Sequence, residues 1–177
     1  GEGIPDWTIE LKNSTGSVIK TATTGSDGTY SFCELVPGNY TVSEVVDPDY
    51  IATGPTSIDV ELECANSEDN DFKNTALLCI NVTKTDGRND LGLEGWTMEL
   101  RNSTGNLIDS KDTDADGKCS FCELEPGSYT VCEVLKGGWK NVTERCVNVE
   151  LECDDASVNF ENIPKLCING TKINNCT

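Results

Sequence analysis

Ten cysteines are the residues of this 177-residue sequence whose type and spacing point most directly to chemistry. A zinc site needs two closely spaced ligand pairs, yet Cys119 and Cys122 are the only close couple and histidine is absent. The sequence therefore favours disulfide bonds formed in an oxidising compartment. The cysteines are Cys33, Cys64, Cys79, Cys119, Cys122, Cys132, Cys146, Cys153, Cys167 and Cys176.

Four acidic residues have the spacing of a calcium-binding loop, in which carboxylate oxygens at alternate positions surround one ion. They are Asp112, Asp114, Asp116 and Glu123. The matching stretch in the first half of the chain has Thr23 and Gly25 in place of the first two carboxylates, so any such site would be single. The alternative is an acidic turn that binds no ion, and it is favoured because no flanking helices are expected. The sequence predicts no other cofactor.

Seven Asn-X-Ser/Thr sequons, together with the cysteines, indicate a glycosylated protein outside the cell. They begin at Asn13, Asn39, Asn81, Asn102, Asn141, Asn169 and Asn175. The net charge of −18 argues against nucleic acid and anionic membranes as partners, since both need a basic surface. No catalytic constellation is recognisable, so we predict that the chain is not an enzyme. No signal peptide or transmembrane run is recognisable either, so we expect a mature or excised segment.

These residues belong to a unit that occurs twice. Residues 24–44 and 113–133 are identical at 14 of 21 positions, at a constant offset of 89. Alternating apolar residues predict strands throughout and no helix, so the fold class is all-β with two tandem sandwiches. The Asp-Gly dipeptides at 27–28 and 116–117 predict hairpin turns, the first followed by a strand with Tyr30 and Phe32 on one face. Residues 47–57 are expected to form a loose loop.

The two copies differ at their ends. The second copy opens with a strand whose inward positions carry Leu78, Ile80, Val82 and Lys84. Nothing equivalent precedes Trp7, but residues 165–177 repeat the pattern with Leu166, Ile168 and Lys172. We therefore expect an incomplete first sandwich at residues 1–75, a complete second one at 76–163, and a donor-type strand at 164–177. This strand would complete the first sandwich of a neighbouring unit.

Two arrangements of neighbouring units fit the sequence. From Lys84 to Trp96 is 12 positions, and from Lys172 through Thr177 and a following Gly1 to Trp7 is also 12. This match favours one long polypeptide made of tandem units. Separate chains joined by donated strands are the alternative, and either arrangement gives a linear array.

Cysteine parity agrees with a shared strand. The second copy contains six cysteines, whereas Cys33 and Cys64 of the first copy become four when a borrowed strand adds Cys167 and Cys176. Cys132 and Cys146 together replace two serines of the first copy at outward positions, so we predict that they pair. The other connectivities stay open.

The repeated motif TDADGKxSFxEL-PGxYTVxE, the pattern GW-T-EL-N-TG before it and a closing F-x-N resemble the B-type repeats of bacterial and archaeal surface proteins. These are the collagen-adhesin B-like (Cna B) and serine-aspartate-repeat (SdrD) B-like domains. The resemblance covers essentially the whole chain and implies a prealbumin-like, inverse Ig-like Greek-key sandwich. The first copy departs from the pattern because it lacks its first strand, and both copies are unusually rich in cysteine.

The resemblance also implies an internal isopeptide bond between a lysine and an asparagine, promoted by a buried acid. The residues that match by position are Lys84, Asn162 and Glu133 in the second copy, and Asn74, Glu44 and a neighbouring unit's Lys172 in the first. The second-copy trio has inward phase, and burial would push its lysine toward the neutral amine and its glutamate toward the protonated acid. The alternative is a lysine–glutamate ion pair.

We predict a structural subunit of an extracellular, cell-surface polymer such as a filament, sheath or surface layer. It would bind itself head to tail by strand complementation, reinforced by disulfide and isopeptide bonds. It would carry N-linked glycans and would neither bind nucleic acid nor insert into membranes. The alternative is an adhesin or receptor-type binding module whose exposed loops, such as residues 47–57, contact a ligand.

Overall fold

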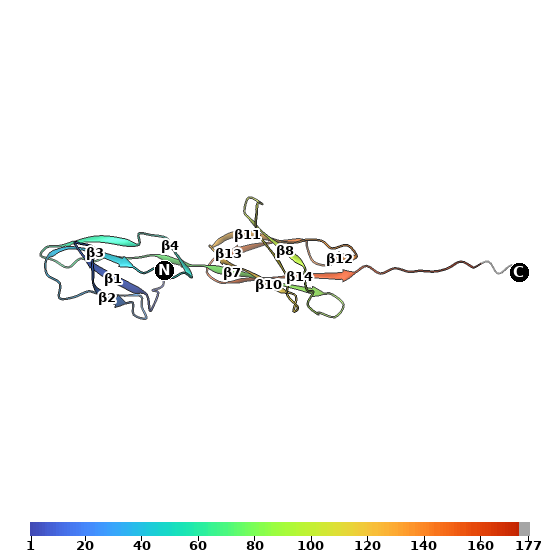
Figure 1. The fold of residues 1–177 in the computed structure, drawn as a ribbon, viewed down its shortest axis with the longest axis horizontal. Helices are drawn as coiled ribbons and strands as arrows, with labels where there is room; N and C mark the ends of the chain where they lie inside the picture. The colour runs from blue at the N-terminus through green and yellow to red at the C-terminus, as the bar shows by residue number, and fades with distance from the viewer. Residues whose placement is uncertain (174–177) are drawn as a thin grey trace. The chain divides into compact units, whose positions relative to one another are not determined.

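The computed structural model describes residues 1–173, which form strands, turns and loops. The chain divides into two compact units, Gly1–Ala76 and Leu77–Thr177, each of which is visible in Figure 1. Within the described part of the chain, no helix is long and apolar enough to cross a membrane.

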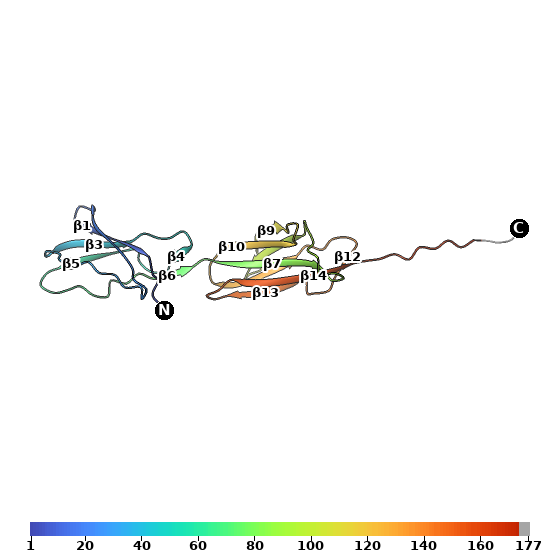
Figure 2. The same ribbon diagram turned by 90° about the horizontal axis from the view of Figure 1, so that it is seen from below.

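The second unit contains two four-stranded sheets. One has the order β10-β7-β14-β12, with β7 between β10 and β14 in Figure 2. Its strands are β7 (Leu78–Asp86), β10 (Lys118–Leu124), β12 (Trp139–Asn141) and β14 (Ala156–Pro164). The other sheet has the order β13-β11-β8-β9. Its strands are β8 (Thr97–Asn102), β9 (Leu107–Asp112), β11 (Gly127–Glu133) and β13 (Cys146–Leu151).

The core of the second unit receives alternate side chains from both sheets. The central strand β7 supplies Ile80 and Val82, which are almost fully buried. The other sheet supplies Met98, Leu100 and Val131, which are likewise inaccessible to solvent. The predicted inward phase of β7 is confirmed, because every second residue from Leu78 onward is buried.

The Asp116-Gly117 turn is not a hairpin, which corrects the sequence interpretation. It joins β9 to β10, and these strands lie in different sheets because β10 pairs with β7. Gly117 has a φ of 74°, and a Cβ atom there would meet the backbone oxygen of Lys84 at 2.2 Å. Glycine therefore allows the turn to lie directly against β7.

The first unit has one four-stranded sheet and one two-stranded sheet. The order in the larger sheet is β2-β1-β3-β5, and β4 pairs with β6 in the smaller one. The strands are β1 (Thr8–Asn13), β2 (Val18–Thr23), β3 (Gly38–Glu44), β4 (Tyr50–Ala52), β5 (Ser57–Leu62) and β6 (Asn74–Ala76). The buried core consists of Trp7, Ile9, Leu11, Val42 and Val60.

Two sequence expectations are wrong in this unit. No strand forms around Tyr30 and Phe32, although the matching stretch of the second unit is β10. The reason is that β10 gains its hydrogen bonds from β7, and no described strand of the first unit occupies that place. The expected loose loop at residues 47–57 also contains β4, whose Tyr50 ring packs edge-on against Trp7 at 5.0 Å.

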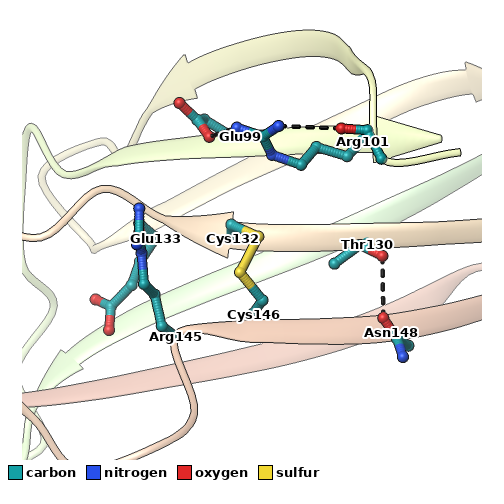
Figure 3. The surroundings of a disulfide bond; sticks show 9 residues. Glu99, Arg101, Thr130, Cys132, Glu133, Arg145, Cys146 and Asn148 are labelled. Atoms are coloured by element: carbon teal, nitrogen blue, oxygen red, sulfur yellow. Dashed lines mark hydrogen bonds and ion pairs between the residues drawn. A yellow bond between two sulfur atoms is a disulfide. The ribbon is translucent and has the colours of Figure 1, made fainter.

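Two disulfide bonds form among residues 1–173, both in the second unit. Cys132 and Cys146 pair as predicted and join β11 to β13, beside a hydrogen bond of 3.0 Å from Thr130 to Asn148 (Figure 3). Cys79 on β7 bonds to Cys122 on β10. The free cysteines among the described residues are Cys33, Cys64, Cys119, Cys153 and Cys167, and Cys176 lies outside those residues.

Replacing both Cys132 and Cys146 with serine is expected to destabilise the second unit by about 3 kcal/mol. The bond closes a short loop and so lowers the conformational entropy of the unfolded chain, and the variant regains that entropy on unfolding. The first unit supplies the reference, since Ser43 and Ser57 face each other at the same register of β3 and β5. Urea unfolding of the full chain measures the change. A double variant as stable as the parent would contradict the expectation.

Candidate cross-link sites

Three strands of the second unit bring the predicted trio together. Lys84 and Asn162 come from the parallel neighbours β7 and β14, in which Phe160 is the register partner of Lys84. Glu133 ends β11 in the opposite sheet, where it pairs with Met98 of β8. The lysine and the asparagine therefore reach the carboxylate from across the sandwich.

The trio is sealed from solvent. Lys84 and Glu133 have no exposed surface, and Asn162 is 1% exposed. The Lys84 Nζ lies 2.9 Å from Glu133 Oε2, and the Asn162 Nδ2 donates a hydrogen bond to the same oxygen at 2.9 Å. Glu133 Oε1 and Asn162 Oδ1 have no hydrogen-bond partner in the described part of the chain. Buried oxygens left in this way are costly unless the site has a use for them.

Burial lowers the pKa of Lys84 below its ordinary value, and the hydrogen bond to and charge of Glu133 oppose that shift. The ammonium group lies 4.7 Å from the centre of the Trp96 ring and 6.0 Å from that of Phe160. The aromatic rings exclude water while they tolerate the cation. The amine can therefore lose its proton more easily than an exposed lysine can.

In a variant with Asn162 replaced by alanine, no Lys84–Asn162 bond can form and the lysine keeps its amine. Because the pKa of Lys84 is lowered in the folded state, the unfolded chain binds more protons at pH values between that lowered pKa and the ordinary value of 10.5. The free energy of unfolding should therefore rise with pH in the window between the lowered pKa and that ordinary value. Comparison with a variant that also carries Lys84→Met isolates the contribution of the lysine. If the free energy of unfolding changed with pH equally steeply in both variants, this expectation would be contradicted.

In the first unit, two of the three corresponding residues are in contact. The Asn74 Nδ2 donates a hydrogen bond of 2.5 Å to Glu44 Oε2, and Glu44 is 7% exposed. Within the described chain, Glu44 Oε1 and Asn74 Oδ1 have no hydrogen-bond partner, like their counterparts in the second unit. Among the described residues, no lysine forms an ion pair with Glu44. The predicted partner, Lys172, is exposed and belongs to the stretch 165–173, which forms no strand.

A groove in the first unit corresponds to the place of β7 in the second. Its volume is about 730 Å³, and its walls are residues 28–35 and 63–71. Leu11, Val42 and Val60 of the core lie at its base. In the second unit the matching stretches flank β7, which fills this position with buried apolar side chains.

The acidic residues of the predicted calcium loop have other partners. Asp114 accepts hydrogen bonds from the backbone amides of Asp116 and Lys118, and Asp112 accepts one from Thr97. Glu123 lies on β10, away from the turn. Among residues 1–173, no group of three or more acidic or cysteine side chains could hold a metal ion. The geometry here is that of an acidic turn.

Sequence reasoning did not identify the aromatic lining of the trio or the Cys79–Cys122 pair. Trp96 recurs at the repeat offset as Trp7, and this recurrence is a signal that the tryptophan belongs to the site. The disulfide could have been found from strand register, because Phe121 pairs with Ile80 and thereby sets Cys122 opposite Cys79. The recurrence of the tryptophan is visible in the sequence alone, whereas the disulfide signal needs the pairing of the strands.

The β-sandwich of the second unit, with its inward lysine, acid and asparagine, has the features that the resemblance to B-type repeat domains of surface proteins implies. The sequence model of the SdrD B-like domain matches residues 1–93, and that of the SpaA prealbumin-like fold domain matches residues 79–164. The chain belongs to the SdrD B-like domain family, which confirms the resemblance and the fold class. The chain is therefore assigned to the cell surface, and the families that it matches are structural domains of surface proteins.

The curated relatives are much longer proteins. The chain is 34% identical over 152 residues to serine-aspartate repeat-containing protein D of Staphylococcus aureus strain Newman, covering 73% of this chain and 12% of the relative. It is 29% identical over 177 residues to protein E of strain MSSA476, covering 88% of this chain and 16% of the relative. The chain thus spans less than a fifth of either protein.

Solved structures with a similar arrangement include pilins. The minor pilin GBS52 of Streptococcus agalactiae has 17% identity and a TM-score of 0.45, with 98% of this chain and 89% of that chain covered. The shaft pilin SpaA of Lactobacillus rhamnosus GG has 14% identity and a TM-score of 0.46, with 94% and 90% covered. The Bacillus anthracis TIE protein has 20% identity and a TM-score of 0.48, with 90% and 31% covered.

Proposed function

We propose that the chain is the structural unit of a cell-surface polymer that assembles head to tail. Residues 166–172 of one copy enter the groove of the first unit of the next copy and take the place that β7 has in the second unit. The observation that carries this proposal is the groove itself, which lies where a buried strand lies in the other repeat. The partner of the chain is thus another copy of the same unit.

The donated segment has the chemistry that the groove needs. Leu166 and Ile168 are 82% and 103% exposed, and they stand at the positions of the buried Leu78 and Ile80. Burying two such side chains contributes about 3–6 kcal/mol. New hydrogen bonds to the unpaired walls at residues 28–35 and 63–71 add to this.

We further propose that both trios form amide cross-links. The Lys84 Nζ gives up a proton through Glu133 and attacks Cγ of Asn162, so that an amide bond forms and the Asn162 nitrogen leaves as ammonia. The mass of the chain falls by one ammonia, with no change of oxidation state. In the first unit, Lys172 of a neighbouring copy would attack Asn74 in the same way beside Glu44. This second bond would join adjacent units covalently.

The assembly state of the full chain tests the proposal. We expect the 177-residue protein to form concentration-dependent linear oligomers in sedimentation velocity experiments and rods in electron micrographs. A chain that ends at Pro164 keeps both units and should remain monomeric. A synthetic peptide of residues 165–177 should inhibit assembly of the full chain. A full chain that stays monomeric at high concentration would overturn the proposal.

Native material distinguishes separate chains from a tandem polypeptide. After boiling, reduction and removal of N-linked glycans, a species at 19.1 kDa would indicate separate chains without amide links between them. A ladder or one very large species would indicate covalent continuity. Peptide mapping then separates a Lys172–Asn74 amide from an ordinary peptide bond between Thr177 and Gly1. Both forms of continuity give the same linear array.

N-linked glycans would coat the outside of this polymer. Asn39, Asn81 and Asn169 are exposed, and Asn13, Asn102 and Asn141 are partly exposed. Asn175 lies outside the described residues. The net charge of −18 and the glycans would together limit unspecific sticking between polymers.

The alternative role as a ligand-binding module has less support. The loop at residues 47–57, which would contact a ligand, is held by the pairing of β4 with β6 and by the packing of Tyr50 on Trp7. A donated strand and a half-formed lysine site are features that a polymer needs. A binding module has no use for either.

A further inference from the structure

The second unit contains a disulfide between its first strand and the neighbouring strand. Cys79 on β7 lies opposite Cys122 on β10, next to the register pair Ile80 and Phe121. The bond thus fixes the strand whose counterpart is missing from the described part of the first unit. The second unit thus shows how a disulfide bond holds a strand in this position.

Both cysteines of this bond have counterparts that are free. Cys33 stands 89 positions before Cys122, is exposed, and lines the groove of the first unit. Cys167 stands 88 positions after Cys79 and is exposed in the unpaired segment after β14. When the segment enters the groove in the register of β7, Cys167 lies opposite Cys33.

Two differences between the units, one on each of the facing segments, favour the same register of the donated segment. In the second unit, Val82 is the register partner of Cys119, and both face inward. Their counterparts are Gly170 in the donated segment and Tyr30 in the groove wall. The large ring thus meets the residue without a side chain, where it can fill the space that valine fills in the other unit. A segment shifted by one residue would lose this fit and turn its apolar face outward.

We propose that Cys167 of one copy forms a disulfide bond with Cys33 of the next copy once the strand is seated. The inference rests on the proposed strand complementation and adds to it a redox-dependent covalent link between units. Seating precedes oxidation, because only the paired strands bring the two sulfur atoms within bonding distance. The link is distinct from the amide at Lys172, which lies five residues further along the segment.

Formation of the Cys33–Cys167 bond needs a disulfide oxidant such as oxidised glutathione. The thiolate of Cys167 attacks the oxidant and displaces one glutathione thiol, and the thiolate of Cys33 then attacks the mixed disulfide and displaces the second. Two cysteine thiols are oxidised and one glutathione disulfide is reduced. Cys119 does not compete, because burial raises the pKa of its thiol to about 11 and keeps it protonated.

Seating the strand exchanges contacts across the groove. The Tyr30 hydroxyl donates a hydrogen bond of 2.5 Å to the backbone oxygen of Asn70, which joins the two walls. The incoming strand must displace this bond. It offers one in return, because Ser120 donates a hydrogen bond of 2.7 Å to Asn81 in the second unit, and Ser31 and Asn169 are their counterparts.

The test uses the full chain with Lys172→Arg, which removes the amide route. The purified reduced protein is treated with oxidised glutathione and run on a denaturing gel without reductant. We expect a ladder of multimers that dithiothreitol collapses to the monomer, and a mapped peptide that joins Cys33 to Cys167. Adding Cys33→Ser or Cys167→Ser should abolish the ladder. Adding Cys153→Ser, which changes an exposed cysteine outside the groove, should leave it unchanged.

Sedimentation separates failure of this inference from failure of the proposed function. The Cys167→Ser variant should still form oligomers under native conditions, because strand complementation does not need the disulfide. Native oligomers with a ladder that does not depend on Cys167, or a mapped Cys33–Cys64 bond within one chain, would overturn the disulfide alone. Monomers in every variant, including the parent, would overturn strand complementation and the disulfide with it.

Discussion

Replacing Glu133 with alanine is expected to lower the free energy of unfolding of the second unit by about 3–5 kcal/mol, which is the usual cost of leaving one buried charge unpaired. The Lys84 ammonium would remain at 0% exposure with its nearest carboxylate removed. The same change removes the group that takes the proton from the amine, so the Lys84–Asn162 amide should not form. Thermal unfolding and the intact mass of the full chain measure the two effects.

The chain offers a matched control in its first unit. Glu44 has the same hydrogen bond to an asparagine, but it forms no ion pair with a lysine of the described chain. Glu44→Ala should therefore cost only about 1–3 kcal/mol, the loss of a hydrogen bond to a charged group. Glu133→Gln keeps the size of the side chain and should still prevent the loss of ammonia. Equal destabilisation by Glu133→Ala and Glu44→Ala would show that the lysine is not a buried charge.

The inward phase of the site was predictable because alternation along a strand is a local property. Ile80 and Val82 define the inner face of β7, and Lys84 follows them at the same phase. Glu133 follows Val131 on β11 in the same way. The periodicity thus places each residue inside the sandwich, and the resemblance to B-type repeats selects which of them belong together.

Sheet membership was not predictable in the same way, because strand pairing is non-local. Residues 24–44 and 113–133 are nearly the same sequence, yet only the second copy forms a strand after the Asp-Gly turn. Phe121 has Ile80 as a partner across the sheet, and Phe32 has no described partner. The Asp-Gly turn is the same in both copies, and Thr29 and Tyr30 favour a strand at least as much as their counterparts Lys118 and Cys119 do. The supply of backbone hydrogen bonds therefore decides the outcome.

The two disulfide bonds also show that a non-local contact is hard to predict from the sequence. Cys132 and Cys146 were predictable because two serines of the first copy change to cysteine together, which points to a direct contact. Cys79 and Cys122 have no such signal, since Cys122 has a counterpart in Cys33 whose partner would come from another copy. Repeats reveal a contact only when both of its members vary together within one chain.

The second large expected effect concerns the proposed covalent link between units, because the first unit repeats part of the lysine site and contains a groove. Glu44 and Asn74 already have the contact that Glu133 and Asn162 have. Glu44 Oε1 and Asn74 Oδ1 are buried without a hydrogen-bond partner among the described residues, as Glu133 Oε1 and Asn162 Oδ1 are beside Lys84, so the half-site has the same unsatisfied oxygens as the complete one. In the proposed assembly, a segment seated in the register of β7 would carry Lys172 of the next unit to the place that Lys84 has in the second unit.

Replacing Lys172 with arginine is therefore expected to eliminate multimers that survive both boiling and reduction. Arginine keeps the positive charge and length, but its guanidinium group stays protonated and cannot act as the attacking amine. The measurement is a denaturing gel of the assembled full chain after treatment with dithiothreitol, which removes any disulfide contribution. Native assembly should persist, because Leu166 and Ile168 still enter the groove.

Lys165→Arg is the matched control, since it makes the same substitution in the same exposed segment, seven residues earlier. It should leave the resistant multimers unchanged, whereas Glu44→Gln and Asn74→Ala should remove them as Lys172→Arg does. The two partner variants act on the accepting unit and the lysine variant on the donating unit. A mixture of Lys172→Arg chains with Asn74→Ala chains should therefore regain dimers, because one chain keeps the lysine and the other keeps the asparagine. Resistant multimers in Lys172→Arg alone, or no dimers in the mixture, would refute an amide between units.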